Sequence, residues 1–119
     1  MARILVIDDD PHIQTALSDV LSHFGHDVLL AANGREGLVR YRECHPDLVI
    51  TDIFMPESNG LDVILDLAPT SANIIAMSGG GDLDCGDYLD DAIEFGARRG
   101  LRKPFTINAL VEAVNEIVA

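Results

Sequence analysis

Short apolar runs alternate along this chain with longer segments in which apolar residues recur every three or four positions. The runs have the length of buried strands, and we predict strands at 4–7, 28–31, 48–51, 74–77 and 97–101. The longer segments have the spacing of helices that bury one face. Five strands that alternate with helices predict an α/β protein, with one parallel sheet covered by helices on both faces.

Capping residues indicate where the helices begin and end. Asp10 and Pro11 suit the N-cap and the first position of a first helix. Asn33, with Glu36 three residues later, resembles a capping box for a second helix that runs to about Cys44. These signals separate the first three strands by helical segments, as the βαβ pattern requires.

The apolar spacing also predicts the buried face of each helix. In the first helix this face comprises Ile13, Ala16, Leu17, Val20, Leu21 and Phe24. In the helix after the third strand it comprises Leu61, Ile64, Leu65 and Ala68. A loop with Gly79, Gly80, Gly81 and Gly86 leads to a fourth helix around 88–95. The last helix, capped by Thr106, buries Leu110, Val111, Val114, Ile117 and Val118.

The order of the strands predicts where a functional site lies. Right-handed crossovers leave few arrangements for five parallel strands, and the order 2-1-3-4-5 fits best. In such sheets the functional crevice lies outside the carboxyl ends of the strands. Five polar side chains are expected at that edge, namely Asp8, Asp9, Asp52, Ser78 and Lys103.

These residue types suit phosphoryl chemistry. Three carboxylates held close together repel one another, and a bound divalent cation, Mg²⁺ or Mn²⁺, relieves the repulsion. A carboxylate beside such a cation acts as a nucleophile toward phosphorus. Lys103 would neutralise charge on the transferring group, and Ser78 would donate a hydrogen bond to one of its oxygens. The pattern therefore predicts a site at which an aspartyl phosphate forms.

Four motifs connect this prediction to a family. The segments VIDDDP, TDIFMPESNG, MSGG and RKPF closely resemble the motifs of response-regulator receiver domains, in order and spacing, over essentially the whole chain. The resemblance implies the flavodoxin-like, CheY-like (βα)5 fold. It also implies that Asp52 is the phosphoacceptor, that Lys103 binds the phosphate and that Ser78 is the switch hydroxyl.

The resemblance implies the metal ligands as well. Asp9 and Asp52 would bind Mg²⁺, Asp8 would hold it directly or through water, and the backbone carbonyl of Phe54 would be a further ligand. The peptide bond between Lys103 and Pro104 is cis in the family. The sequence departs from the family at residue 100, where Gly100 replaces the usual Tyr or Phe.

Composition excludes several functions. The chain has 20 acidic and 8 basic residues, for a formal net charge of −12, so its surface repels nucleic acids and anionic membranes. Cys44 and Cys85 lack CxxC spacing and nearby metal-ligand partners, which is typical of a reduced, cytoplasmic setting. No apolar run is long enough for a membrane span.

Together, the residues and the resemblance predict a single-domain response regulator over residues 1–119, with no output domain. It would accept and hydrolyse its own phosphoryl group without being a dedicated enzyme. Its expected partners are a histidine kinase or phosphotransfer protein, with acetyl phosphate as a further candidate donor, and a downstream protein. The downstream protein would bind the face of the fourth helix, fifth strand and fifth helix, and the chain would be a monomer or weak homodimer.

Three other functions compete with this one. The first is a receiver-like interaction or dimerisation module that works without phosphorylation, which Gly100 favours and the intact acidic residues oppose. The second is a phosphatase or phosphotransferase for small substrates, which normally needs a substrate cap that is not evident in 119 residues. The third is a receiver cut from a longer regulator.

Overall fold

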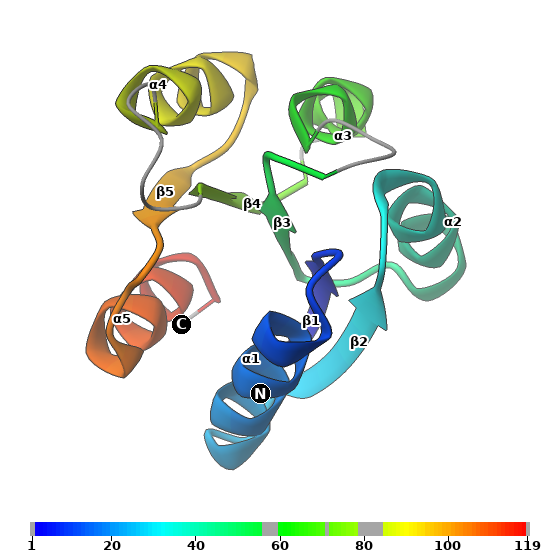
Figure 1. Ribbon diagram of the computed structural model, residues 1–119. Coiled ribbons are helices and arrows are strands. Elements are labelled where there is room, and N and C mark those ends of the chain that lie inside the picture. The colour runs from blue at the N-terminus through cyan, green and yellow to red at the C-terminus, as the bar shows by residue number, and fades with distance from the viewer. Residues whose placement is uncertain (1, 56–59, 71, 79–84, 119) are drawn as a thin grey trace.

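Five parallel strands form one sheet with helices on both of its faces in the computed structural model (Figure 1). The structure describes residues 2–55, 60–70, 72–78 and 85–118, without the side chains of 85–88. The strands are β1 (Arg3–Ile7), β2 (Asp27–Ala31), β3 (Leu48–Asp52), β4 (Ile74–Ser78) and β5 (Arg99–Arg102). The helices are α1 (Pro11–His23), α2 (Gly34–Cys44), α3 (Gly60–Leu67), α4 (Cys85–Phe95) and α5 (Ile107–Val118), with a short 3₁₀ helix at Ala68–Thr70.

The strand order is β2-β1-β3-β4-β5, as the sequence predicts. Side chains alternate between the two faces of the sheet, so each face has its own apolar core. Ile4 and Val6 of β1 pack in the core under α1 and α5. Leu5 and Ile7 of the same strand pack in the core under α2, α3 and α4. Strands β3 and β4 are buried along their whole length, which explains their continuous apolar runs.

Two element boundaries were predicted incorrectly. Strand β5 is Arg99–Arg102 rather than 97–101, so the apolar residue Ala97 precedes the strand, and its backbone N–H donates to the carbonyl of Ala92 at the end of α4. Helix α4 begins at Cys85 rather than near residue 88, which places Gly86 in the helix. The predicted loop glycines at 79–81 lie outside the described residues.

The predicted buried faces of two helices also needed correction. Phe24 is 52% exposed because α1 ends at His23, and its ring packs edge-on against the His23 ring instead of on the sheet. Ala16 is exposed too. In α3, Leu65 is 47% exposed, whereas the buried residues are Gly60, Val63, Ile64 and Leu67. Apolar residues surround most of this short helix, so their spacing alone does not determine which face is buried.

Candidate functional site

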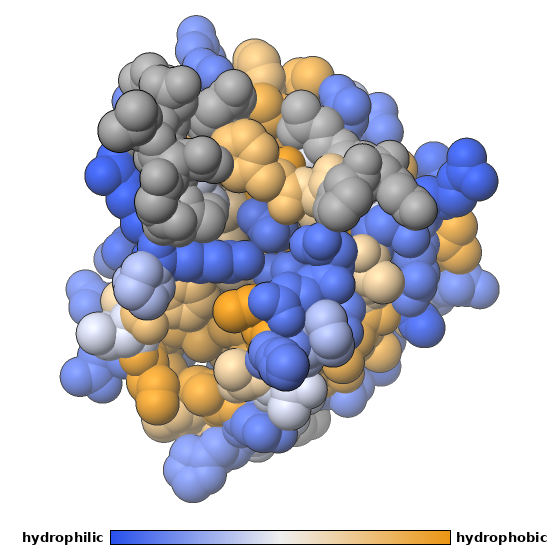
Figure 2. Space-filling model, in the orientation of Figure 1, coloured by the Kyte–Doolittle hydropathy of each residue, from blue (hydrophilic) through white to orange (hydrophobic). Residues whose placement is uncertain are grey.

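Residues from four separate strand ends meet at the carboxyl edge of the sheet. Asp8 follows β1, Asp52 ends β3, Ser78 ends β4 and Lys103 follows β5. The carboxylates of Asp8, Asp9 and Asp52 each place one oxygen within 4.8 Å of the others. In the space-filling view, hydrophilic residues gather in the middle of the face shown, with apolar residues around them (Figure 2). The structure therefore brings together the three carboxylates and Lys103, and it places Ser78 at the end of the neighbouring strand β4.

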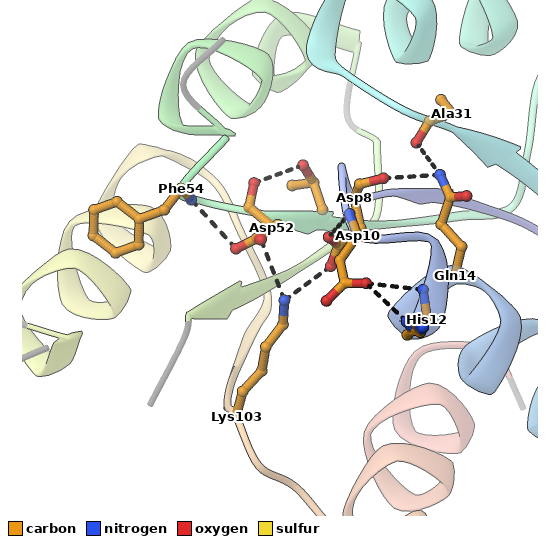
Figure 3. Close-up of polar contacts among 9 residues, drawn as sticks. Asp8, Asp10, His12, Gln14, Ala31, Asp52, Phe54 and Lys103 are labelled. Carbon is orange, nitrogen blue, oxygen red and sulfur yellow. Dashed lines mark hydrogen bonds and ion pairs between the residues drawn. The ribbon is translucent and has the colours of Figure 1, made fainter. Parts of the chain in front are cut away.

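Lys103 lies between two of the carboxylates. Its Nζ donates to Oδ2 of Asp8 at 2.8 Å and to Oδ2 of Asp52 at 3.2 Å, as Figure 3 shows. Its backbone N–H donates to the carbonyl of Ser78 at 2.7 Å, which ties the end of β5 to the end of β4. The Lys103–Pro104 peptide bond is cis, as the family resemblance implies. Lys103 is thus anchored by main chain and side chain to three of the strand ends.

The three carboxylates differ in how deeply they are buried. Asp8 is fully buried and Asp52 is nearly so, whereas Asp9 is exposed. Oδ1 of Asp8 accepts the backbone N–H of Asp10 at 2.9 Å, so internal donors contact both of its oxygens. Asp10 itself is the N-cap of α1, because its carboxylate accepts the N–H of His12 at 2.8 Å. The predicted capping role of Asp10 is confirmed.

The charge of Asp52 is costly where it lies. Burial raises the pKa of Asp52, and the nearby Asp8 carboxylate raises it further, although the Lys103 ammonium opposes both effects. Burial works in the opposite direction on Lys103, but the hydrogen bond to Asp8 and the charges of both carboxylates outweigh it and raise the pKa of Lys103. The Lys103 ammonium therefore stays protonated, whereas burial makes the charged form of the Asp52 carboxyl group less favourable.

Asp52 has one further donor from the main chain. The N–H of Phe54 donates to Oδ1 of Asp52 at 3.3 Å. The Phe54 ring points away from the carboxylate in Figure 3, and the residue is 37% exposed. The contact brings the Phe54 main chain next to the carboxylate, which a carbonyl ligand from this residue would require.

The Ser78 hydroxyl has no hydrogen-bond partner among the described residues. Its side chain is fully buried, and its Oγ makes no hydrogen bond with any part of the chain that the structure describes. A buried hydroxyl without a partner costs on the order of 1–3 kcal/mol, so such groups are rare and often functional. The Ser78 hydroxyl therefore has a hydrogen that no described residue accepts.

The donor set fits a hard divalent cation. Carboxylate oxygens are the ligands that Mg²⁺ and Mn²⁺ prefer, and three of them lie together in this cluster. Lys103 supplies one positive charge against the three negative charges of Asp8, Asp9 and Asp52, so an additional cation would complete the neutralisation. The residues are thus suited to the metal that the sequence predicts.

Two residues that support the site were not among the predicted site residues. Gln14 of α1 donates its side-chain amide to backbone carbonyls beside the acidic residues. Gly60 lies against the main chain of Asp52, where a Cβ would meet the Asp52 carbonyl oxygen and would lie 2.7 Å from the Ile53 Cα. Gly60 belongs to the motif TDIFMPESNG, so its place in the motif was a signal, whereas nothing local marks Gln14.

Replacing Gly60 with alanine is expected to destabilise the protein by about 3 kcal/mol, because the added Cβ meets backbone atoms that cannot rotate away. Gly37→Ala is the matched control, since its Cβ meets the buried side chain of Ile7, chiefly its terminal Cδ1, instead of backbone. Urea unfolding of both variants checks this prediction. A smaller loss for Gly60→Ala than for Gly37→Ala would contradict it.

Gly100 lets a helix approach β5 closely. A Cβ at this position would lie 3.1 Å from Cδ2 of Leu89, so the buried Leu89 side chain of α4 fills the space above the glycine. Where the family resemblance leads one to expect an aromatic ring, α4 packs directly on β5.

The fold and the site define a doubly wound α/β protein with an acidic, lysine-bridged pocket at the carboxyl edge of its sheet. The chain matches the response regulator receiver domain family over residues 4–115. Chemotaxis protein CheY of Thermotoga maritima is 36% identical to it over 118 residues, which cover 97% of this chain and 96% of the relative. Protein PilH of Pseudomonas aeruginosa is 35% identical over an aligned length of 125 residues, and the alignment covers 100% of this chain and 99% of PilH.

Solved structures agree with this match. A response regulator receiver domain protein from Clostridium thermocellum superimposes with a TM-score of 0.90 at 35% identity, over 99% of this chain and 94% of that chain. The chain therefore belongs to the response regulator receiver domain family, and it acts in two-component phosphorelay signalling. A receiver-like module that works without phosphorylation is not favoured. None of the described helices is long and apolar enough to cross a membrane.

Proposed function

We propose that this protein is a phosphorylation switch in which Asp52 accepts the phosphoryl group. The observation that carries the proposal is the pair of contacts from Lys103 to Asp8 and Asp52, at 2.8 and 3.2 Å, on the same edge as a buried Ser78 hydroxyl that has no partner among the described residues. A phosphoryl group on Asp52 needs a cation to neutralise its charge and a donor for its oxygens. Lys103 and Ser78 are residues of these two kinds.

The proposed transfer is a single displacement at phosphorus. A carboxylate oxygen of Asp52 forms a bond to the phosphorus, and the bond from phosphorus to the donor breaks. The electron pair of that bond stays on the leaving group, which is an imidazole nitrogen of a phosphohistidine or a carboxylate oxygen of acetyl phosphate. Lys103 neutralises the phosphoryl oxygens, and Ser78 donates its hydroxyl hydrogen to one of them.

We propose Mg²⁺, or Mn²⁺ in its place, as the cofactor. Asp8, Asp9 and Asp52 would hold it together with the carbonyl of Phe54, and the oxygen atoms that meet within 4.8 Å support this assignment. When bound, the cation supplies positive charge that reduces repulsion between the carboxylates and the incoming phosphoryl group.

The proposed output surface consists of α4, β5 and α5. Ser78 and Arg102 are paired in the β4–β5 register, and the N–H of Lys103 donates to the Ser78 carbonyl. A shift of Ser78 toward a phosphoryl group would therefore act directly on β5. Such coupling through adjacent, hydrogen-bonded strands is a physical route from the site to the surface.

Side chains on the same three elements suit a protein partner. Ile93 of α4 is 44% exposed and Ile107 of α5 is 58% exposed. Arg99 of β5 forms an ion pair with Glu116 of α5. We propose that a downstream protein binds this surface, while a histidine kinase or phosphotransfer protein approaches Asp52. Nucleic acid and membranes are not proposed as partners, because the net charge of −12 opposes both.

We further propose that the protein is cytoplasmic and is a monomer or weak homodimer. We propose that it has no dedicated enzyme activity beyond loss of its own phosphoryl group.

The proposal is tested by incubating the protein with acetyl phosphate and Mg²⁺ and measuring its intact mass. We expect one phosphoryl adduct that is stable in acid, labile in base and located at Asp52 by peptide mapping after borohydride reduction. Chelating the metal with EDTA is expected to abolish the adduct. Amide shifts induced by beryllofluoride are expected to extend from the site to β5 and α5.

Three results would contradict the proposal. An adduct on a residue other than Asp52 would remove the assigned phosphoacceptor. An adduct that forms equally well in EDTA would remove the metal. No adduct with either acetyl phosphate or phosphoramidate, together with no amide shifts on addition of beryllofluoride, would leave the phosphorylation-independent module as the better description.

A further inference from the structure

The side-chain amide of Gln14 contacts the ends of two strands at once. Its Nε2 donates to the backbone carbonyl of Asp8 at 2.8 Å and to the backbone carbonyl of Ala31 at 3.0 Å. Figure 3 shows the Gln14 side chain reaching from α1 to both carbonyls. Both partners are acceptors only, so the amide nitrogen must face them, and its two hydrogens are both used.

These contacts lie just beyond the last pairing of β1 with β2. Asp8 donates its own N–H to the Ala31 carbonyl at 3.1 Å, so Ala31 accepts one hydrogen bond from the main chain and one from Gln14. The Asp8 carbonyl accepts the Gln14 amide at the point where the chain leaves the sheet. Gln14 thus holds the chain in place where the sheet ends.

Gln14 also closes the turn that carries the acidic residues. Its backbone N–H donates to the carbonyl of Asp10 at 3.1 Å, in the first turn of α1. Main chain and side chain of one residue therefore hold both ends of the segment from Asp8 to Asp10. Asp9, in the middle of that segment, forms no hydrogen bond or ion pair with the described residues, and its carboxylate position depends on the backbone of the turn.

We propose that Gln14 is a positioning residue for the cation site, which holds the Asp8–Asp10 turn so that the Asp8 and Asp9 carboxylates face Asp52. This inference rests on the proposed function, because it assumes that these carboxylates bind a divalent cation. Gln14 acts through the main chain and would not touch the cation or the phosphoryl group. Residues that orient ligands in this way typically contribute a factor of about 10 to 100 to metal affinity.

The test is a titration of the unphosphorylated protein with Mg²⁺, in which the amide chemical shifts of Asp9 and Asp10 report binding. Gln14→Met keeps the length and bulk of the side chain but removes both donated hydrogen bonds. We expect it to weaken Mg²⁺ binding by about 10-fold and to speed hydrogen exchange at the Asp8 amide. Gln14→Arg retains side-chain N–H donors and is expected to bind Mg²⁺ more tightly than Gln14→Met.

Leu17→Val is the matched control. Leu17 is buried on the same helix and packs in the apolar core, so its truncation lowers stability without removing either hydrogen bond of Gln14. We expect its Mg²⁺ affinity to stay within about twofold of the wild-type value, because both hydrogen bonds from Gln14 to the strand ends are kept.

The outcomes distinguish this inference from the proposed function. Wild-type affinity in Gln14→Met would overturn the role of Gln14 and leave the proposed function intact. An equal loss of affinity in Leu17→Val would also overturn it, because general stability would then explain the effect. Failure of the wild-type protein to bind Mg²⁺ would overturn the proposed cation site itself.

Discussion

Asp52→Asn is expected to abolish the phosphoryl adduct and, at the same time, to raise the stability of the metal-free protein at pH 7. The adduct is lost because an amide oxygen is a far weaker nucleophile than a carboxylate. The stability rises because burial makes the Asp52 charge unfavourable, which is why the pKa of Asp52 is raised. Lys103 keeps Asp8 as its partner in the variant.

The sign of the pH dependence follows from that raised pKa. A carboxyl group with a raised pKa in the folded state contributes stability at low pH, and this contribution is lost as the pH rises through the folded pKa. Wild type therefore carries the full penalty at pH 7, and the advantage of Asp52→Asn should shrink as the pH is lowered. Urea unfolding of the metal-free proteins across this range measures the effect.

Asp9→Asn is the control for this prediction. It removes a carboxylate from the same cluster, but Asp9 is exposed, so little gain in metal-free stability is expected. Asp9→Asn should instead weaken the Mg²⁺ dependence while Asp52 still accepts a phosphoryl group. A stability loss in Asp52→Asn at pH 7 would show that Asp52 is held by its partners more strongly than burial opposes it.

Lys103→Met is expected to lower the stability of the metal-free protein at pH 7 by about 3 kcal/mol, since it leaves buried carboxylates without their cation. It should also slow adduct formation from acetyl phosphate by on the order of 10²–10³-fold, because the charge on the phosphoryl oxygens is no longer neutralised. Urea unfolding and time-resolved intact mass measure the two effects.

Two comparisons separate charge from packing. Saturating Mg²⁺ should recover part of the stability of Lys103→Met, because the cation replaces the lost positive charge. Lys103→Arg keeps the charge but changes the shape of the side chain. It should therefore retain most of the wild-type stability but a smaller share of the wild-type rate of adduct formation. A wild-type rate of adduct formation in Lys103→Met would remove Lys103 from the proposed chemistry.

Several features of the fold could be predicted because they depend on short stretches of sequence or on general rules of chain topology. Runs such as 48–51 and 74–77 lie in strands buried on both faces, so they are continuously apolar and easy to recognise. The Asp10 cap depends on contacts within two residues, and the sequence is therefore sufficient to predict it. The strand order follows from rules of handedness that hold for most parallel sheets.

The predictions were wrong where the local apolar pattern fitted more than one buried face or more than one strand boundary. In α3, Leu61 and Leu65 fit a buried face nearly as well as Val63 and Leu67, and only packing against the sheet selects among them. The position of β5 was similarly ambiguous, because Ala97 continues the apolar pattern but precedes the strand.

The sequence by itself determined the α/β class and the set of polar residues at the carboxyl edge, because each depends on periodicity or on neighbours in the chain. It also determined the strand order, because the handedness of the crossovers leaves few arrangements. Only the tertiary structure decided which of these residues touch. The contact of Lys103 with Asp8 joins residues 95 positions apart. That the Ser78 hydroxyl has no partner in the described part of the chain depends on the segments packed around it. The support from Gln14 is of the same kind, since it requires β1, β2 and α1 to be in place together. Such contacts follow from the packing of distant segments, which local sequence rules do not encode.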